Sequence, residues 1–384
     1  MIKSGKRLPA GTDFSAEPTE HRYIRARDIK AGKICLDDVA YIGKETKKAI
    51  KKYIINSGDV AITIVANIGD IGFATQDCDG INLTENAVRL TEFDESVVYS
   101  KYLAYYLGQT SMKAHMENLA AGAAQAKLGI YKIEKIKVQL PDVSIQRAAV
   151  NIIEQYDNLI EVNNKRIKIL EQMAENLYKE WFVRFRFPGY ETAEFENGIP
   201  KGWKIRHLSD VADVEMGQSP PSECYNNEKK GLPFHQGVGS YGELYLEDST
   251  YSTEGKRLAE PNSIIFSVRA PVGRINITLN RIILGRGIAG INSKTKNNAF
   301  LYWQLKNAFA TEDIIGNGSI FASVTKDELQ GQRVLIPDKG MIDFFNLIAV
   351  KTERLIRSIY LENRNLIKQR DLLLPRLMSG KLEV

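Results

Sequence analysis

Two Pro-Asp pairs are the residues with the clearest potential for chemistry, because such a pair can begin a nuclease motif in which the aspartate binds a metal ion. The pairs lie in "VQLPD" and "VLIPD", where the candidate ligands are Asp142 and Asp338. They occupy matched positions, and each comes shortly before a long stretch with helical spacing. Capping of a helix N-terminus by Asp142 or Ser144 explains this placement better than catalysis does.

The sequence shows no other recognisable arrangement of catalytic residues. The sequence has no G-x-x-x-x-G-K-[ST] loop, and its four histidines lie too far apart for a zinc site. His115, His207 and His235 have no nucleophile or acid partner that the sequence reveals, so we expect ordinary surface or core residues. We therefore expect a chain that is not an enzyme and that binds no cofactor and no metal ion.

The composition is that of a globular protein with two or three domains in 384 residues. The start, "MIKSGKRLPAG", has no apolar signal core, and the apolar runs are too short to span a bilayer. The three cysteines are scattered, which favours reduced thiols in the cytoplasm. The net charge of +5 permits nucleic-acid binding without demonstrating it.

One pattern of apolar residues occurs twice in the sequence. "SGDVAITIVANIGDIGFA", residues 57–74, and "PNSIIFSVRAPVGRINIT", residues 261–278, share their apolar rhythm, with Ala66 over Ala270 and Gly69 over Gly273. Three further blocks follow in the same order: 81–90 over 282–291, 101–107 over 299–305, and 138–142 over 334–338. Four collinear blocks indicate a duplication of a unit of about 200 residues, in which a compact α+β domain precedes one long helix.

Each expected helix carries an apolar seam in steps of three and four residues, which is typical of a coiled coil. The first seam is Ala149, Ile152, Tyr156, Leu159, Asn163, Ile167, Leu170, Ala174, Leu177 and Trp181, with a local stutter after Asn163. The second is Ile342, Phe345, Ala349, Thr352, Ile356, Ile359, Asn363, Leu366, Arg370, Leu373 and Leu377.

An asparagine near the middle of each seam costs stability but fixes the register and orientation of paired helices. We assign this role to Asn163 and Asn363; the alternative is that both are exposed. Pro375 should bend or end the second helix, and Gly380 is a natural stop. Antiparallel pairing would place the two α+β domains at opposite ends of a rod of about 55 Å. Since the DNA repeat is about 34 Å, the two domains would then face successive turns of one duplex.

At this point the sequence resembles the specificity (S) subunit of type I restriction–modification systems. The stretch 197–221, "NGIPKGWKIRHLSDVADVEMGQSPP", looks like the start of that family's second target-recognition domain. The stretches 163–182 and 362–384 look like its central and distal conserved helices. The resemblance implies target-recognition domains at 1–141 and 187–339, a central helix at 142–186 and a distal helix at 340–384.

The resemblance also implies the function and the partners. Each domain would read one half of a bipartite, asymmetric DNA site in the major groove, while the helices set the spacing and dock two modification (M) subunits. S-adenosylmethionine, ATP and Mg are then expected only on the M and restriction (R) subunits. In one respect the sequence departs from the pattern. The second copy opens with a segment at residues 199–214 that has no counterpart in the first copy. We therefore expect either that the start codon lies upstream or that this family member tolerates the loss of the segment.

Matched positions that differ in charge between the copies are candidates for reading different bases. Val65 faces Arg269, Asp70 faces Arg274 and Glu85 faces Arg286. Arginine forks on guanine are the commonest specific base contact, and lysines on phosphate set affinity. The DNA-binding candidates of the second domain are Tyr241, Arg269, Arg274 and Arg286. Those of the first domain are Lys6, Arg7, Arg25, Arg27, Lys47, Lys48, Lys51 and Lys52.

Two other classes of function stay open at the level of sequence. A coiled-coil adaptor that binds only protein would show the same helices, and a binding assay with DNA separates it from the leading hypothesis. A stand-alone enzyme would need an assembled active site, which the sequence does not show.

Overall fold

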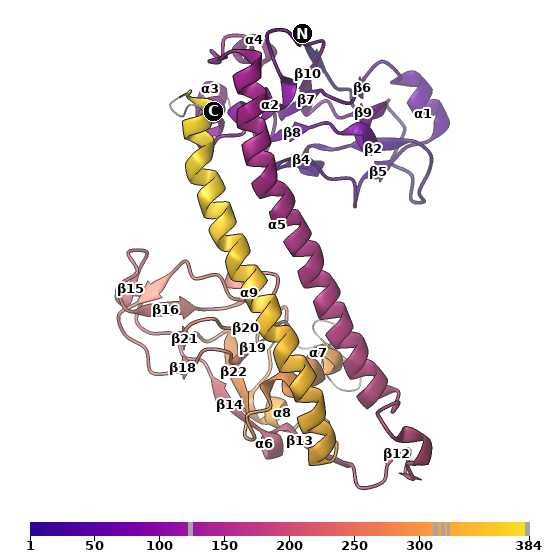
Figure 1. Ribbon diagram of the computed structural model, residues 1–384, viewed down its shortest axis with the longest axis vertical. Coiled ribbons are helices and arrows are strands. Elements are labelled where there is room, and N and C mark those ends of the chain that lie inside the picture. The colour runs from indigo at the N-terminus through magenta and orange to yellow at the C-terminus, as the bar shows by residue number, and fades with distance from the viewer. Residues whose placement is uncertain (122–125, 310–313, 316–318, 321–322, 381–384) are drawn as a thin grey trace. The chain divides into compact units, whose positions relative to one another are not determined.

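In this computed structural model, residues 1–121, 126–309, 314–315, 319–320 and 323–380 are described. The chain divides into two compact units (Figure 1). Unit 1 is Met1–Asn163 with Leu361–Val384, and unit 2 is Asn164–Tyr360. Each long helix therefore contributes one part to each unit. None of the helices in the described part of the chain is long and apolar enough to cross a membrane.

The described residues of unit 1 form two sheets and four short α-helices. The first sheet has the order β1-β10-β7-β8-β4-β3, and the second has the order β5-β2-β9-β6. The strands of the first are β1 (Ile2–Ser4), β10 (Ala87–Leu90), β7 (Val60–Thr63), β8 (Ile71–Phe73), β4 (Gly32–Ile34) and β3 (Ile29–Lys30). Those of the second are β5 (Ala40–Tyr41), β2 (Arg22–Ile24), β9 (Ile81–Leu83) and β6 (Ile54–Ile55). The helices are α1 (Lys44–Ala49), α2 (Ser100–Leu107), α3 (Thr110–Ala120) and α4 (Ile130–Ile133).

Unit 2 contains the corresponding pair of sheets, in the orders β14-β22-β19-β20 and β15-β17-β16-β21-β18. The first comprises β14 (Ala212–Met216), β22 (Ile288–Ser293), β19 (Ile264–Ser267) and β20 (Ile275–Ile277). The second comprises β15 (Tyr225–Asn226), β17 (Tyr251–Ser252), β16 (Leu232–His235), β21 (Ile282–Leu284) and β18 (Leu258–Ala259). Three pairs complete it: β11 (Phe195–Glu196) with β12 (Ile199–Pro200), β13 (Lys204–His207) with β25 (Arg333–Ile336), and β23 (Ile314–Ile315) with β24 (Ser319–Ile320). The helices are α6 (Leu208–Val211), α7 (Asn298–Ala308) and α8 (Lys326–Gln330).

The predicted duplication is confirmed down to the strand register. In unit 1, β7 pairs with β10 so that Thr63 faces Ala87, and in unit 2 the matched pair is Ser267 with Ile288. A close approach of backbones is also repeated: a Cβ on Gly5 would lie 2.0 Å from the Thr84 carbonyl oxygen, and one on Gly217 would lie 2.1 Å from that of Gly285. Only glycine fits at these two positions, so the repeat preserves backbone packing as well as apolar rhythm.

The segment at residues 199–214, which opens the second copy, forms regular secondary structure in unit 2. It provides β13 and α6, and β13 pairs along its length with β25 at the end of the domain, from Lys204 opposite Ile336 to His207 opposite Arg333. The stretch of unit 1 that matches β25, residues 138–140, is not in a strand.

The long helices are α5 (Val143–Tyr178), which a π-helical turn at Lys179–Val183 continues, and α9 (Lys339–Met378). The Asp338 carboxylate accepts a hydrogen bond of 3.0 Å from the Met341 backbone N–H, which caps α9 as expected for such a position. The helix does not end at Pro375 but continues to Met378, and Gly380 follows with a φ of +65°. Residues 381–384 of the predicted distal helix lie outside the described residues, as do 122–125, 310–313, 316–318 and 321–322 of the two predicted domains.

The two helices pack antiparallel within each unit. In unit 1, Ala149, Val150 and Ile153 near the start of α5 form one core with Leu377 and Met378 at the end of α9. In unit 2, Ala174 near the end of α5 shares a core with Phe345 and Ala349 near the start of α9. The fold is therefore α+β, with two similar domains, each packed on a pair of antiparallel helices.

The seams follow the predicted spacing with one correction. Every position of the predicted α9 seam is buried or half-buried. On α5 the prediction that Leu159 lies in the seam is wrong, because its side chain is 40% exposed. The place opposite α9 is instead occupied by Asp157, whose carboxylate pairs at 2.8 Å with Arg370, and by the Ile160 carbonyl, which accepts from Asn363 at 3.4 Å. These two polar contacts shift the apolar stripe around α5 at the predicted stutter.

The two seam asparagines meet inside unit 1. Both are buried, and Asn163 Nδ2 donates to Asn363 Oδ1 at 3.0 Å. Asn163 also donates to a Glu362 carboxylate oxygen at 3.1 Å. The pair therefore joins α5 and α9 at one defined position along the seam.

Candidate nucleic-acid interface

Three strand ends of unit 2 converge on one place. The parallel strands β16 and β21 end side by side, with His235 opposite Leu284, and β19 ends at Ser267 opposite the first residue of β22. Backbone hydrogen bonds join the segments that follow: the Gly287 N–H donates to the Gln236 carbonyl at 3.0 Å, and the Val268 N–H donates to the Gly287 carbonyl at 3.0 Å. The side chains that leave these segments are thus held at fixed spacing.

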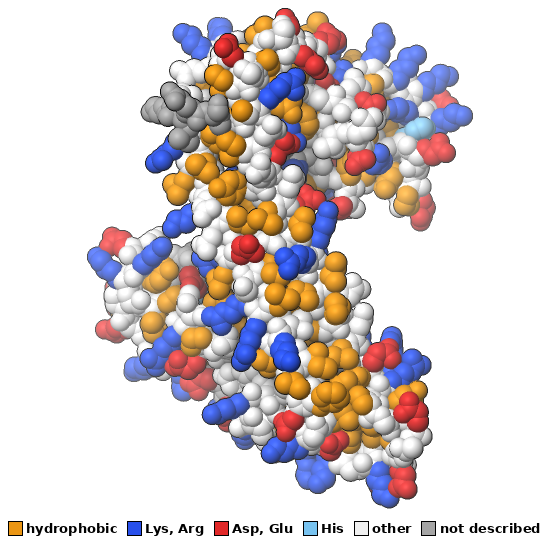
Figure 2. All heavy atoms as spheres, viewed as in Figure 1, with side chains coloured by type: hydrophobic (Ala, Val, Ile, Leu, Met, Phe, Trp, Pro, Cys, Tyr) orange, Lys and Arg blue, Asp and Glu red, His pale blue; other side chains and the backbone are white. Residues whose placement is uncertain are grey.

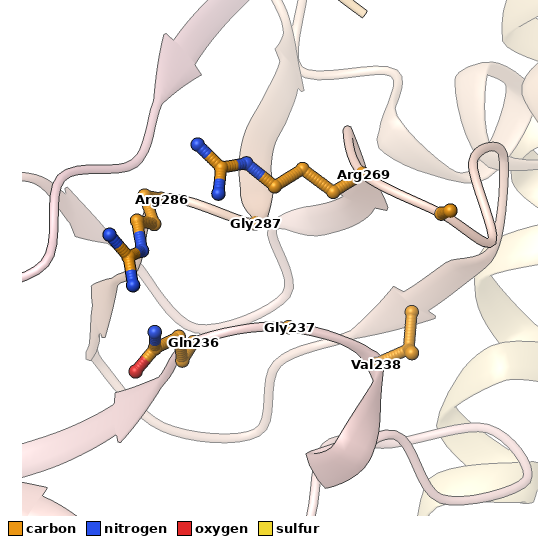
Figure 3. A pocket seen from close by; sticks show the side chains of 7 residues that line it. Gln236, Gly237, Val238, Arg269, Arg286 and Gly287 are labelled. Atoms are coloured by element: carbon orange, nitrogen blue, oxygen red, sulfur yellow. The ribbon is translucent and has the colours of Figure 1, made fainter. Parts of the chain in front are cut away.

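These segments enclose a shallow hollow of about 290 Å³. Its lining is Gln236, Gly237, Val238, Arg269, Ala270, Arg286 and Gly287. Figure 3 shows the guanidinium groups of Arg269 and Arg286 above the loop that carries Gln236 and Gly237. Both arginines are exposed, and neither forms an ion pair or a side-chain hydrogen bond with the described residues. Two of the four candidates predicted for the second domain therefore lie together.

The other two candidates of this domain lie apart from the hollow. Arg274 is exposed just before β20, where its backbone N–H donates to the Ser267 hydroxyl at 2.9 Å. Tyr241 packs against an apolar cluster, and its hydroxyl oxygen is shut off from solvent without a hydrogen-bond partner among the described residues. Burial raises the pKa of this phenol well above its ordinary value of 10, so the hydroxyl stays neutral.

His235 is a core residue, as expected, but it has an acid partner that the sequence does not reveal. The fully buried His235 has Nδ1 at 2.8 Å from the Ser240 hydroxyl and Nε2 at 3.0 Å from the Asp248 carboxylate. These are the residue types of a hydrolytic triad, but the imidazole is inaccessible to any substrate. The contacts instead fix the Gly237–Ser240 loop that forms one wall of the hollow. Asp248 lies on a loop 13 positions along the chain, and no local spacing announces it.

The matched place in unit 1 has a different charge pattern. The register of β2 on β9 sets Arg25 at the position that corresponds to Gln236, and the repeat matches Val65 and Glu85 to Arg269 and Arg286. Arg25 is not free for a ligand, since Nε and Nη2 donate to the Asp28 carboxylate at 3.0 and 2.9 Å, and these bonds raise its pKa. Glu85 lies 3.6 Å from Arg7. The predicted Arg25 is thus part of an internal ion pair.

The remaining basic candidates of unit 1 fall into two groups. Arg27 pairs with Asp38 at 2.8 Å, Lys6 lies 5.7 Å from the centre of the Tyr53 ring, and Lys47 donates to the Gly80 carbonyl at 2.7 Å. Burial lowers the pKa of Lys47. By contrast, Lys48, Lys51 and Lys52 are exposed on α1 and just after it. Figure 2 shows basic side chains gathered over this part of unit 1.

No group of three or more His, Cys, Asp or Glu side chains among the described residues is placed to hold a metal ion. Asp338 is used as a helix cap, and Asp142 directly precedes α5, where its carbonyl accepts from the Gln146 N–H at 3.0 Å. The two candidate metal ligands of the Pro-Asp pairs therefore lie at the N-terminal ends of the two long helices.

The family whose description is "type I restriction modification DNA specificity domain" matches residues 2–172 and 200–366. The chain belongs to this family. The match falls on both copies of the repeat and includes most of α5 and α9. Membership of the specificity-domain family therefore rests on nearly the whole chain.

Individual relatives cover most of this chain. The type I restriction enzyme MjaIX specificity subunit of Methanocaldococcus jannaschii is 26% identical over 360 residues, which are 88% of this chain and 82% of the relative. The HindI specificity subunit of Haemophilus influenzae is 22% identical over 447 residues, with 96% of both covered. The crystal structure of a type I restriction-modification system S subunit from M. genitalium has a TM-score of 0.59 at 14% identity, and covers 98% of this chain and 93% of its own. This last likeness supports the fold.

Proposed function

We propose that this chain is the specificity subunit of a type I restriction–modification complex. Each α+β domain would read one half of a bipartite, asymmetric site in the major groove of duplex DNA. The observation that carries the proposal is the family match to both copies of the repeat. The unpaired arginines of the hollow in unit 2 support it, because exposed guanidinium groups without internal partners suit contact with base edges and phosphates.

Two modification subunits and the restriction subunits are the proposed protein partners. The helices carry apolar side chains that are 37–61% exposed, at spacings that place them along a helix face. On α5 these are Leu159, Val162, Ile169 and Met173, and on α9 they are Phe344, Leu347, Ile348 and Leu355. Such faces suit docking of helices or domains from a partner.

The chain itself would perform no chemistry in this assembly. S-adenosylmethionine, ATP and Mg would be bound by the modification and restriction subunits, and this chain would supply recognition. The helices would set the spacing between the two half-sites, since α5 and α9 each run without interruption from one compact unit into the other. The proposed compartment is the cytoplasm, because the proposed action on DNA requires access to it; the free thiols of Cys35, Cys78 and Cys224 support this proposal.

A protein-binding adaptor without DNA specificity is not favoured. The family match covers the α+β domains as well as the helices. An adaptor that worked only through its helices would give no reason for two domains that keep the same strand register but differ in charge at matched loops.

The test is co-expression with the modification subunit of the same system, followed by single-molecule sequencing for N6-methyladenine. A methylated motif in two halves, separated by an unread spacer, is the expected result. A stable complex that methylates no defined motif would contradict the proposal. Failure to form any complex would favour the adaptor function instead.

A further inference from the structure

The two arginines of the hollow have no ion-pair partner among the described residues, unlike two other exposed arginines of the same domain. Arg257 pairs with Glu215 at 2.6 Å, and Arg281 pairs with Glu260 at 2.9 Å. Arg269 and Arg286 have no such carboxylate among the described residues. Two uncompensated cations that share one hollow repel each other, and an incoming group rich in acceptor atoms relieves this repulsion.

The walls of the hollow suit a flat ligand edge rather than a deep guest. Gly237 and Gly287 present backbone without side chains, and the backbone bonds among Gln236, Gly287 and Val268 hold the walls rigidly. The third polar side chain is the neutral Gln236, which is exposed and carries both a donor and an acceptor. A phosphate offers only acceptors, so a site built for phosphate alone would use the donor of the amide and leave its acceptor oxygen without a partner.

We propose that the hollow formed by Arg269, Arg286 and Gln236 reads a guanine-containing step of one half-site in the major groove. At least one arginine binds the O6 and N7 atoms of guanine as a fork, and Gln236 reads the neighbouring base pair, for which adenine gives the matching pattern of N6 and N7. This inference rests on the proposed function, and it assigns the hollow to base recognition by unit 2 alone.

Unit 1 supplies a built-in comparison. Its matched residues are Arg25, held by Asp28, with Val65 and Glu85. A valine and a carboxylate do not donate to guanine O6 or N7, so the guanine preference belongs to the half-site that unit 2 reads. The two half-sites therefore differ at matched positions, as an asymmetric target requires.

The experiment is selection of binding sites from a randomised duplex library by the full chain, both alone and in complex with its modification subunits. The variants are Arg269→Val and Arg286→Glu, each of which installs the residue found at the matched position of unit 1. Arg286→Lys keeps the charge but removes the planar fork. Arg281→Gln is the control, because it alters an exposed, ion-paired arginine outside the hollow.

We expect the wild-type chain to select guanine at one or two positions of one half-site. At least one of the variants Arg269→Val and Arg286→Glu should lose that preference by roughly 5- to 100-fold, which corresponds to the usual discrimination of one bidentate contact. The other half-site should stay unchanged, as should both half-sites with Arg281→Gln. Loss of guanine preference in Arg286→Lys with an unchanged salt dependence would identify Arg286 as the fork.

Three outcomes overturn the inference. If both substitutions weaken binding equally for all sequences and lower the salt dependence, the arginines contact phosphate. If a bipartite motif is selected and neither variant changes it, the hollow does not read DNA, although the proposed function stands. If the wild-type chain and its complex select no motif at all, the proposed function itself fails. Equal thermal unfolding midpoints of the variants exclude misfolding as the cause.

Discussion

At the scale of single residues, ion pairing decides which basic side chains are available to a ligand. Arg25 and Arg27 are engaged by Asp28 and Asp38, whereas Arg269 and Arg286 are not paired within the described chain. Comparison of the two copies of the sequence was enough to single out both hollow arginines, because each replaces a residue of different charge. It could not detect the neutral Gln236, or the ion pairs of Arg25 and Arg27, which depend on tertiary contacts.

Glu353 is the residue whose environment predicts a pH dependence. It lies on α9 in unit 2, where burial raises its pKa from 4.5 to about 7. Its field acts on the phenols of Tyr245 and Tyr302, which Glu171 of α5 also faces, while Arg357 has the opposite effect on Tyr245. The carboxyl is therefore preferentially protonated when the protein is folded.

The sign of the effect follows from the raised pKa. The protonated Glu353 carboxyl contributes fully to the stability of the folded protein below about pH 4.5, and this contribution is lost as the pH rises through about 7. We predict that Glu353→Gln, which mimics the protonated acid, raises the free energy of unfolding at pH 8 by up to about 3 kcal/mol and has little effect at pH 4.5, since one pKa unit is about 1.4 kcal/mol.

Urea unfolding at both pH values measures this difference. Asp343→Asn is the matched control, because Asp343 is an exposed carboxylate on the same helix. Equal changes in stability at pH 4.5 and pH 8 for Glu353→Gln would refute the assignment.

At the scale of elements, the heptad pattern predicted both long helices and nearly all of their seams. The spacing of apolar residues carries this information, because it fixes which face of a helix is buried. The prediction for Leu159 is wrong for a physical reason. An ion pair of Asp157 with Arg370 and a hydrogen bond from Asn363 to the Ile160 carbonyl form a polar layer where the pattern predicts an apolar one. A pattern based on apolar residues alone cannot detect a polar layer whose partners lie 200 positions away.

The buried bond between Asn163 and Asn363 makes a prediction for the helix pair. Asn163→Leu removes a hydrogen bond of 3.0 Å inside the seam and should cost about 1–3 kcal/mol of unfolding free energy. The double variant with Asn363→Leu replaces both partners by apolar side chains and should recover most of that loss. A double-mutant cycle should therefore show a coupling free energy above about 1 kcal/mol.

Asn158→Leu, at an exposed position of α5, is the control and should change stability by less than about 0.5 kcal/mol. Additive effects of the two seam substitutions would show that the asparagines do not act as a pair.

At the scale of the whole molecule, the duplication was the strongest signal in the sequence, and the strand register bears it out. Sheet order was not predictable in the same way. The parallel pairs β2 with β9 and β16 with β21 join segments far apart in the chain, and their short strands carry little pattern of their own. These parallel pairs nevertheless place the loops that form the hollow. The scaffold was thus predictable from the apolar pattern, whereas the convergence of these loops at the hollow was not.

The net charge of the molecule, +5 from 52 basic and 47 acidic side chains, is too small to hold DNA by itself. Affinity must then depend on local groups such as Lys48, Lys51 and Lys52, which form no ion pairs with the described residues. We predict that replacing these three lysines by glutamine weakens binding equally for all sequences. The slope of log K against log salt should fall by about 1 for each lysine that contacts phosphate, and the selected motif should stay the same.

The matched control replaces three exposed lysines that already have carboxylate partners. Lys33, Lys201 and Lys230 pair with Glu161, Glu194 and Glu228, so their neutralisation changes the net charge by the same amount. If the effect arose from net charge alone, both triple variants would lower the salt slope equally. If Lys48, Lys51 and Lys52 contact phosphate directly, only the variant that replaces them lowers the salt slope. The reason is that a direct contact releases counterions, whereas a distant charge is screened beyond about 10 Å. A change of the preferred bases in the α1 variant would show instead that these lysines contact base edges.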